Sequence, residues 1–165
     1  MKARLVNTHD VPIKLYLEPG RMIVGNAGIL VSRVVYVKKN GDKTFIIADA
    51  AMNDLIRPTL YDAWHDILPV VQPEAGHRLR EADVVGPVCE SGDYLARSRP
   101  LPPLEAGDLI AIMTAGAYGA VQASTYNSRP LVAEILVKGD RFAIVRPRQS
   151  YEDLVGADRL AGWQG

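Results

Sequence analysis

Short apolar stretches separated by turn residues run along most of the chain. Residues 13–17 partly alternate apolar and polar side chains and stop at a Pro-Gly turn, and the β-branched run 22–37 reads as a bent strand in which Gly28 marks a bulge. Asn40-Gly41 lies in a polar connection after this run and predicts a hairpin. Further strands are expected at 44–49, 65–71, 83–89, 109–113, 131–138 and 141–145. This pattern predicts a mainly β protein with a closed or nearly closed antiparallel architecture.

One or two short helices interrupt the strands. Residues 52–61 could form a short helix or an irregular loop, because Asn53 could cap a helical turn while Pro58 limits its length. Ser150 and Asp153 have the spacing of a capping box, which predicts a short helix through Leu154. Residues 100–108, rich in proline at their start, are expected to form a connector.

Composition and charge exclude several classes of protein. The 165 residues are 48% hydrophobic and 23% charged, as expected for one main globular domain. Nineteen basic and nineteen acidic residues cancel, and no long run of one sign favours a nucleic acid or an anionic membrane as a partner. No apolar run approaches the roughly 20 residues of a membrane helix, and no signal-type segment follows Met1. We therefore expect a cytoplasmic protein.

Cysteine and histidine give little support to a metal site. Cys89 is the only cysteine, which excludes an internal disulfide and a multi-cysteine zinc site. It lies between two turn sequences, so packing in the core and contact with a ligand are both open. The histidines share no metal-ligand spacing and are expected to be structural or solvated: His9, His65 and His77. No metal is expected, and no glycine-rich phosphate loop is present.

Three further polar clusters lie at predicted turns or strand ends. Glu18-Pro19-Gly20-Arg21 could be a surface turn, or could hold a carboxylate and a guanidinium ready for a cationic ring nitrogen and an anion. Arg57 and Tyr61 could end a surface helix or grip a carboxylate. Tyr118, flanked by small residues, could fill core space or admit a ligand closely.

In chain order, the motifs Glu-Pro-Gly-Arg, Arg-Pro-x-Leu-Tyr, Gly-Pro-x-Cys-Glu-Ser-Gly-Asp and Gly-Ala-Tyr-Gly resemble the C-terminal part of the diaminopimelate decarboxylases. These enzymes belong to the pyridoxal-phosphate fold type III group, with the ornithine and arginine decarboxylases. The resemblance extends from about residue 13 to about residue 154, and includes Asn-Ser-Arg-Pro at 127–130. It implies a Greek-key-like β-barrel or sandwich domain at 22–165, preceded at 1–21 by the last strand of a (β/α)₈ barrel and its Glu-Pro-Gly-Arg turn.

The resemblance implies a binding site for pyridoxal 5'-phosphate. Glu18 would pair with the pyridine nitrogen, and Pro19, Gly20 and Arg21 would line the cofactor, the last two beside its phosphate. Tyr118 would touch both cofactor and substrate.

The same resemblance implies roles toward an amino-acid substrate. Arg21, Arg57 and Tyr61 would hold the carboxylate at the end of diaminopimelate that does not react, and Glu90 would hold its ammonium group. Cys89 would be the general acid that returns a proton to the substrate carbon after carbon dioxide leaves.

The implied activity is that of a carboxy-lyase of lysine biosynthesis, which converts meso-diaminopimelate to L-lysine and carbon dioxide. Family members are homodimers with composite active sites, which Cys89 and Glu90 would enter from the partner subunit. The family's Schiff-base lysine lies in the barrel, and no lysine of this chain matches its motif. We therefore expect the chain alone to be inactive. Two alternatives remain open. One is a decarboxylase domain for ornithine, arginine or carboxynorspermidine, and the other is a non-catalytic β-domain that binds a full-length homologue.

Overall fold

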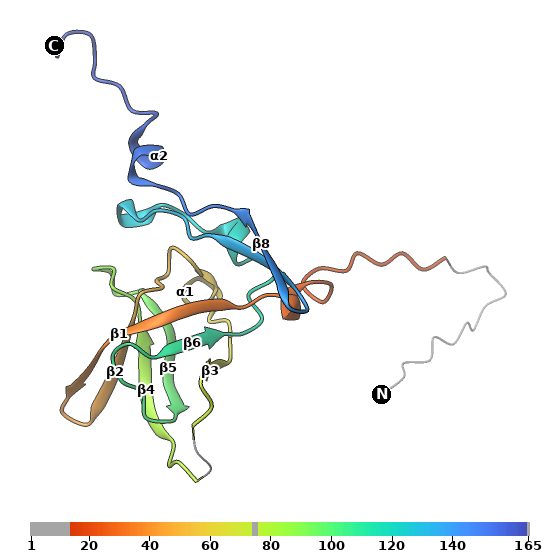
Figure 1. The fold of residues 1–165 in the computed structure, drawn as a ribbon, viewed down its shortest axis with the longest axis vertical. Coiled ribbons are helices and arrows are strands. Elements are labelled where there is room, and N and C mark those ends of the chain that lie inside the picture. The colour runs from red at the N-terminus through yellow and green to blue at the C-terminus, as the bar shows by residue number, and fades with distance from the viewer. Residues whose placement is uncertain (1–13, 74–75, 165) are drawn as a thin grey trace.

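A strongly curved six-stranded sheet forms the body of the protein (Figure 1). The computed structural model describes residues 14–73 and 76–164. The order of strands across the sheet is β3-β6-β1-β2-β4-β5. Their bounds are β1 Leu30–Asn40, β2 Lys43–Ala48, β3 Ile67–Pro69, β4 Arg80–Val85, β5 Tyr94–Leu101 and β6 Leu109–Ile112. The sheet curls into a nearly closed barrel, so the predicted mainly β class is confirmed.

The other elements are short. β7 (Glu134–Lys138) and β8 (Arg141–Arg146) pair only with each other, and they form a hairpin beside the main sheet. Two α-helices, α1 (Arg57–Tyr61) and α2 (Tyr151–Val155), and three 3-10 turns complete the described chain: η1 (Gly25–Ala27), η2 (Ala120–Gln122) and η3 (Tyr126–Ser128). None of the helices in these ranges is long and apolar enough to cross a membrane.

The core lies inside the curved sheet. Alternate side chains of β1 point inward, so Ser32 and Val34 are buried while their neighbours are exposed. The core cluster also takes Leu55 from the segment before α1, together with strand residues Ile46, Ala48, Ile67, Ala82, Val84, Leu95, Ala96, Leu101, Ile110 and Ile112. Leu55 therefore anchors the base of α1 to the sheet.

Local sequence signals for the hairpin and for the last helix are confirmed. Asn40 pairs with Lys43 across a turn in which Gly41 has φ 59°, a left-handed conformation that glycine adopts without strain. At α2, the Ser150 hydroxyl accepts the Asp153 N–H at 3.0 Å, and the Asp153 carboxylate accepts the Ser150 N–H at 2.9 Å. The two bonds form the predicted capping box.

The sheet is mixed rather than antiparallel, because β2 and β4 run parallel. The chain needs a long crossover to join two parallel neighbours, and this crossover from Ala48 to Arg80 carries both α1 and β3. Pro58 lies in the first turn of α1, where proline is tolerated, so it begins the helix rather than limiting it.

Two strand predictions were wrong in detail, and one strand was not predicted. Residues 14–17 form no strand, because no described segment offers them a backbone partner; Ile13 lies outside the described residues. The run 22–37 begins with a turn and η1 before β1 starts, and the register irregularity of β1 lies between Val34 and Tyr36 rather than at Gly28. β5 was not predicted, and it takes Pro100 and Leu101 from the expected connector at 100–108; an edge strand tolerates a proline.

Large apolar side chains remain exposed on two parts of the molecule. The hairpin β7–β8 exposes Leu136, Val137, Phe142 and Ile144, although its strands are paired. Residues 15–24 add Leu15, Tyr16, Leu17, Met22 and Ile23. Several large exposed apolar side chains on one segment are typical of protein interfaces.

Candidate functional site

Arg57 lies between two tyrosine rings. Its guanidinium carbon is 5.6 Å from the ring centroid of Tyr61, one turn along α1, and 5.8 Å from that of Tyr118. Arg57 is only 9% exposed, and its Nε has no hydrogen-bond partner among the described residues. Helix α1 ends at Tyr61, and the next residue, Asp62, has a left-handed backbone and donates its N–H to the carbonyl of Arg57. The short helix thus presents a cation and a phenol side by side, with hydrogen-bonding capacity unused.

The Glu18–Arg21 segment lies against the loop that carries Tyr118. A Cβ placed on Gly20 would lie 3.3 Å from the Tyr118 hydroxyl. Further along, a Cβ on Gly28 would lie 2.6 Å from the Cα of Gly116, and the N–H of Gly116 donates to the Gly25 carbonyl at 3.0 Å. Gly28 and Gly116 therefore allow the backbone after Arg21 to contact the backbone before Tyr118. This contact brings Gly20 beside the Arg57 cluster.

The neighbourhood of this cluster is cationic. His65 is buried and its Nδ1 lies 2.8 Å from the Met113 carbonyl oxygen, so Nδ1 carries the proton and donates. Burial lowers the pKa of His65, and the charges of Arg57, Arg21 and Arg99 lower it further. The guanidinium groups of Arg57 and Arg21, with the phenols of Tyr61 and Tyr118, suit an anion such as a carboxylate.

Asp93 organises the loop that carries Cys89. Its buried carboxylate accepts the N–H of Met52 through Oδ1 and the N–H of Val88 through Oδ2, each at 2.7 Å. Burial raises the pKa of Asp93, while these two bonds favour its charged form. The Cys89 thiol is exposed at the tip of this loop, so the packing alternative for Cys89 is wrong.

Glu90, next to Cys89, has both carboxylate oxygens hydrogen-bonded. Oε1 accepts the N–H of Gly92 at 3.2 Å, and Oε2 accepts the hydroxyl of Tyr126 at 3.3 Å. The side chain remains exposed to solvent. It is therefore oriented by the protein yet open to a ligand.

The structure places the predicted site residues in two groups. Gly20, Arg57, Tyr61 and Tyr118 lie together, and Glu18, Pro19 and Arg21 belong to the segment that contains Gly20. Cys89 and Glu90 lie on the Asp93 loop. Within 14–73 and 76–164, no hydrogen bond, ion pair or cation–π contact joins a residue of one group directly to a residue of the other.

Indirect links hold the two groups in fixed relation. The Thr59 hydroxyl of α1 donates to the Gly92 carbonyl, and the Tyr94 hydroxyl donates to the Pro58 carbonyl at 3.3 Å. The sequence motif ended at Asp93 but assigned it no role, and Thr59 and Tyr126 were not singled out, because each of the three has a partner distant along the chain.

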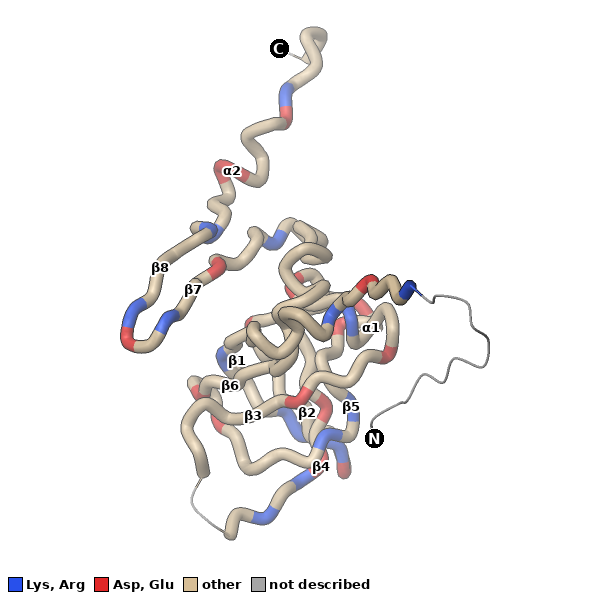
Figure 2. The backbone as a smooth tube through the Cα atoms, turned by 90° about the vertical axis from the view of Figure 1, so that its right-hand side faces the viewer, with Lys and Arg blue, Asp and Glu red and all other residues tan. Residues whose placement is uncertain are grey.

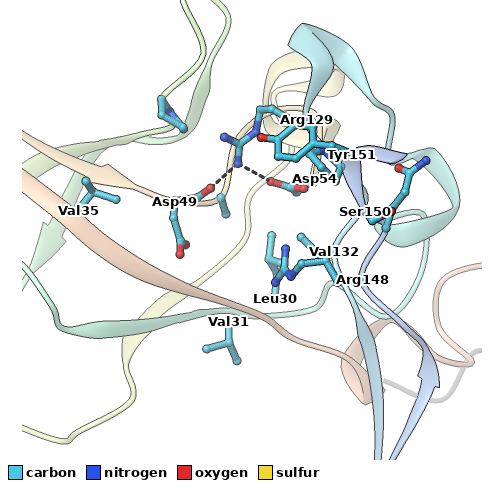
Figure 3. Close-up of a pocket in the computed structure, with 14 residues that line it drawn as sticks. Leu30, Val31, Val35, Asp49, Asp54, Arg129, Val132, Arg148, Ser150 and Tyr151 are labelled. Carbon is cyan, nitrogen blue, oxygen red and sulfur yellow. Dashed lines mark hydrogen bonds and ion pairs between the residues drawn. The ribbon is translucent and has the colours of Figure 1, made fainter. Parts of the chain in front are cut away.

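Arg129 is the centre of a further polar cluster, which also contains Asp49, Asn53 and Asp54. Its guanidinium donates to the Asp49 carbonyl at 2.5 Å and lies 3.6 Å from the Asp54 carboxylate (Figure 3). It also donates to the Asn53 side-chain oxygen at 2.9 Å. This cluster borders a cavity of about 570 Å³, which Arg148 also lines. Arg129 belongs to the Asn-Ser-Arg-Pro sequence, which was the signal for it.

Charge and metal-ligating groups do not define another site in this part of the chain. Figure 2 shows Lys and Arg interspersed with Asp and Glu along the backbone. No cluster of three or more potential metal ligands gathers within the described ranges.

The nearly closed sheet and the cluster of Arg57, Tyr61 and Tyr118 define a β-domain with a cationic group that can bind an anion. Residues 13–116 match the family described as pyridoxal-dependent decarboxylase, C-terminal sheet domain. The chain therefore belongs to the pyridoxal-dependent decarboxylases.

Within that family, its relatives include diaminopimelate decarboxylases. That of Zymomonas mobilis is 53% identical over 150 residues, which cover 91% of this chain and 35% of the relative. That of Archaeoglobus fulgidus is 51% identical over the same length, again with 91% and 35% covered. The crystal structure of diaminopimelate decarboxylase from Helicobacter pylori complexed with L-lysine has 47% identity and a TM-score of 0.77, over 84% of this chain and 34% of that one. The chain spans about a third of the length of these relatives.

Proposed function

We propose that this chain is the C-terminal part of a pyridoxal-phosphate-dependent decarboxylase that converts meso-diaminopimelate to L-lysine and carbon dioxide. The observation that carries the proposal is the buried Arg57 guanidinium, held between Tyr61 and Tyr118 with its Nε unused. A substrate with a second carboxylate gives that group a partner. The homology to diaminopimelate decarboxylases supports the same substrate.

The turn at 18–21 has the donor set for one edge of pyridoxal phosphate. The Glu18 carboxylate would accept the N–H of the protonated ring, and Gly20 and Arg21 would hold the phosphate, with Pro19 stiffening the turn. Gly20 has no side chain to fill the space beside the Tyr118 hydroxyl, so the phenol lies next to the turn and the turn stays accessible to the cofactor. When bound, the cofactor supplies an electron sink for the charge left on the substrate carbon.

The remaining residues divide binding from proton transfer. Arg57 and Tyr61, with Arg21, would hold the distal carboxylate, and Glu90 would hold the distal ammonium group. The exposed Cys89 thiol would deliver a proton to the carbon that has lost its carboxylate. Holding the distal end as a zwitterion ensures that only one end of the substrate reacts.

Because the two groups of site residues do not touch, we propose that they serve two active sites. Cys89 and Glu90 would reach the site of a partner subunit in a homodimer, while Glu18, Arg21 and Tyr118 serve the site of their own subunit. Residues 1–21 would complete a barrel domain and 22–165 would form the β-domain. We place the enzyme in the cytoplasm.

The test joins this chain to the N-terminal two-thirds of the Zymomonas mobilis relative. This barrel-joined protein is expected to turn over diaminopimelate in preference to ornithine, arginine and carboxynorspermidine. Preference for a substrate without the second carboxylate would contradict the roles of Arg57 and Tyr61. Binding to a full-length relative without any decarboxylation would favour an interaction domain instead.

A further inference from the structure

Tyr126 and Glu90 meet across a long separation in sequence. The Tyr126 hydroxyl donates to Oε2 of Glu90 at 3.3 Å, and both side chains are exposed. The other carboxylate oxygen, Oε1, accepts the N–H of Gly92. A glutamate on a loop tip samples several rotamers, and two donors on different segments select one of them. Each oxygen keeps a lone pair for an incoming ammonium group.

The backbone around Tyr126 is held in an unusual conformation. Asn127 and Ser128 follow it with φ 60° and 55°, so two consecutive residues other than glycine are left-handed. Such backbone persists only where surrounding contacts fix it, and it is concentrated at functional sites. The next residue, Arg129, supplies those contacts through its bonds to the Asn53 side chain and the Asp49 carbonyl.

The segment before Tyr126 is attached to the same place. The N–H of Ser124 donates to the Asn53 carbonyl at 2.9 Å, and the Asn53 side-chain amide donates to the Ser124 carbonyl at 3.2 Å. One residue before Asn53, the N–H of Met52 donates to Asp93, which shapes the Glu90 loop. The supports of Tyr126 and of Glu90 therefore converge on one short segment.

We infer that Tyr126 is a positioning residue that holds Glu90 in the rotamer that receives the distal ammonium group of the substrate. This inference rests on the proposed function, because it takes the role of Glu90 from it. Tyr126 acts on Glu90 and touches no reacting atom, so it influences binding rather than the chemical step.

The test measures KM and kcat of the barrel-joined protein for diaminopimelate. Tyr126→Phe removes only the hydroxyl and is expected to raise KM about fivefold with kcat nearly unchanged. In a Glu90→Ala background, the same substitution should produce no further rise. Tyr36→Phe, on an exposed tyrosine of β1, is the matched control. An unchanged KM, or an equal rise in both backgrounds, would overturn the inference.

Crystal structures of the barrel-joined protein provide a readout that does not depend on activity. Glu90 should have one conformer in the parent and several in Tyr126→Phe, and one shared conformer in both would overturn the inference. Failure of the proposed function appears differently, as absent turnover of diaminopimelate by the parent itself. In that case the conformers of Glu90 still decide whether Tyr126 positions it.

Discussion

The hydroxyl of Thr59 donates a hydrogen bond to the carbonyl oxygen of Gly92. This bond attaches helix α1, which carries Arg57 and Tyr61, to the loop that carries Cys89 and Glu90. Together with the hydrogen bond from the Tyr94 hydroxyl to the Pro58 carbonyl, it couples a change on either element to the other.

Loss of that contact should destabilise the fold. Thr59→Val keeps the shape of the side chain and leaves the Gly92 carbonyl without its donor, so we expect the free energy of unfolding to fall by about 1 kcal/mol. Urea unfolding of the 165-residue chain measures the change. Thr44→Val in β2 is the control, because the Thr44 hydroxyl has no hydrogen-bond partner within the described ranges. Equal losses of stability in Thr59→Val and Thr44→Val would show that the Thr59–Gly92 hydrogen bond does not stabilise the fold.

Cys89→Ala should separate turnover from binding. Removal of a general acid is expected to lower kcat of the barrel-joined protein by about 10²-fold or more, with little effect on KM. Steady-state kinetics with diaminopimelate measure both constants. If kcat and KM deteriorated to the same degree, the thiol would be a binding group rather than a proton donor.

Gly116→Ala should disrupt the contact that places Tyr118 beside the 18–21 turn. The added Cβ would meet the Val24 carbonyl oxygen and lie 2.7 Å from the Gly28 nitrogen, so the two backbones must separate. We expect a loss of about 2 kcal/mol in stability, as for overpacked sites, and weaker cofactor binding in the barrel-joined protein. Thermal unfolding and a cofactor titration measure the two effects. Gly162→Ala, which meets no atom within 4 Å, should be neutral.

His65 should make stability depend on pH. Because burial lowers its folded-state pKa below the ordinary value of 6.5, the unfolded chain binds the proton more readily. The His65 contribution is constant well above pH 6.5, and the free energy of unfolding falls as the pH drops through 6.5 toward the folded-state pKa. His65→Asn keeps a donor for the Met113 carbonyl and should flatten this part of the pH profile. His77→Asn, on an exposed histidine, should retain the slope.

The 165-residue chain should self-associate when it is prepared alone. The hairpin β7–β8 and residues 15–24 expose large apolar side chains, among them Met22 at 87% and Phe142 at 75% exposure. Light scattering is expected to show a mass that increases with concentration, and Phe142→Lys should reduce that increase. A monomer at high concentration would contradict this prediction.

The sequence predicted those elements that depend on neighbouring residues. The hairpin at Asn40 and the capping box at Ser150 are local structures, each set by residues no more than three positions apart. The parallel pairing of β2 with β4 depends on residues far apart, and β5 was missed because its polar residues and Pro100 are typical of a loop. Residues 14–17 have a strand pattern, yet they find no partner in the described chain.

In the candidate site, too, the sequence predicted local features but not the contacts between distant segments. Short motifs indicated Glu18, Arg57, Cys89 and Tyr118, since turns and small residues mark places where side chains are displayed. The contacts that orient them are nonlocal, and only the structure shows that Asp93 reaches Met52 from the far side of β4 in the sequence. A buried carboxylate that caps two backbone N–H groups has no signature in the order of residues alone.

The crossover between β2 and β4 is also expected to affect when the site forms during folding. Hairpins such as β1–β2 and β4–β5 close over short loops, whereas β2 and β4 can pair only after the long connection between them is ordered. Helix α1 lies inside that connection, and its tie to Gly92 needs β4 and the following loop in place. We therefore expect Arg57 and Glu90 to reach their fixed relation at a late step of folding, after most of the local structure is complete.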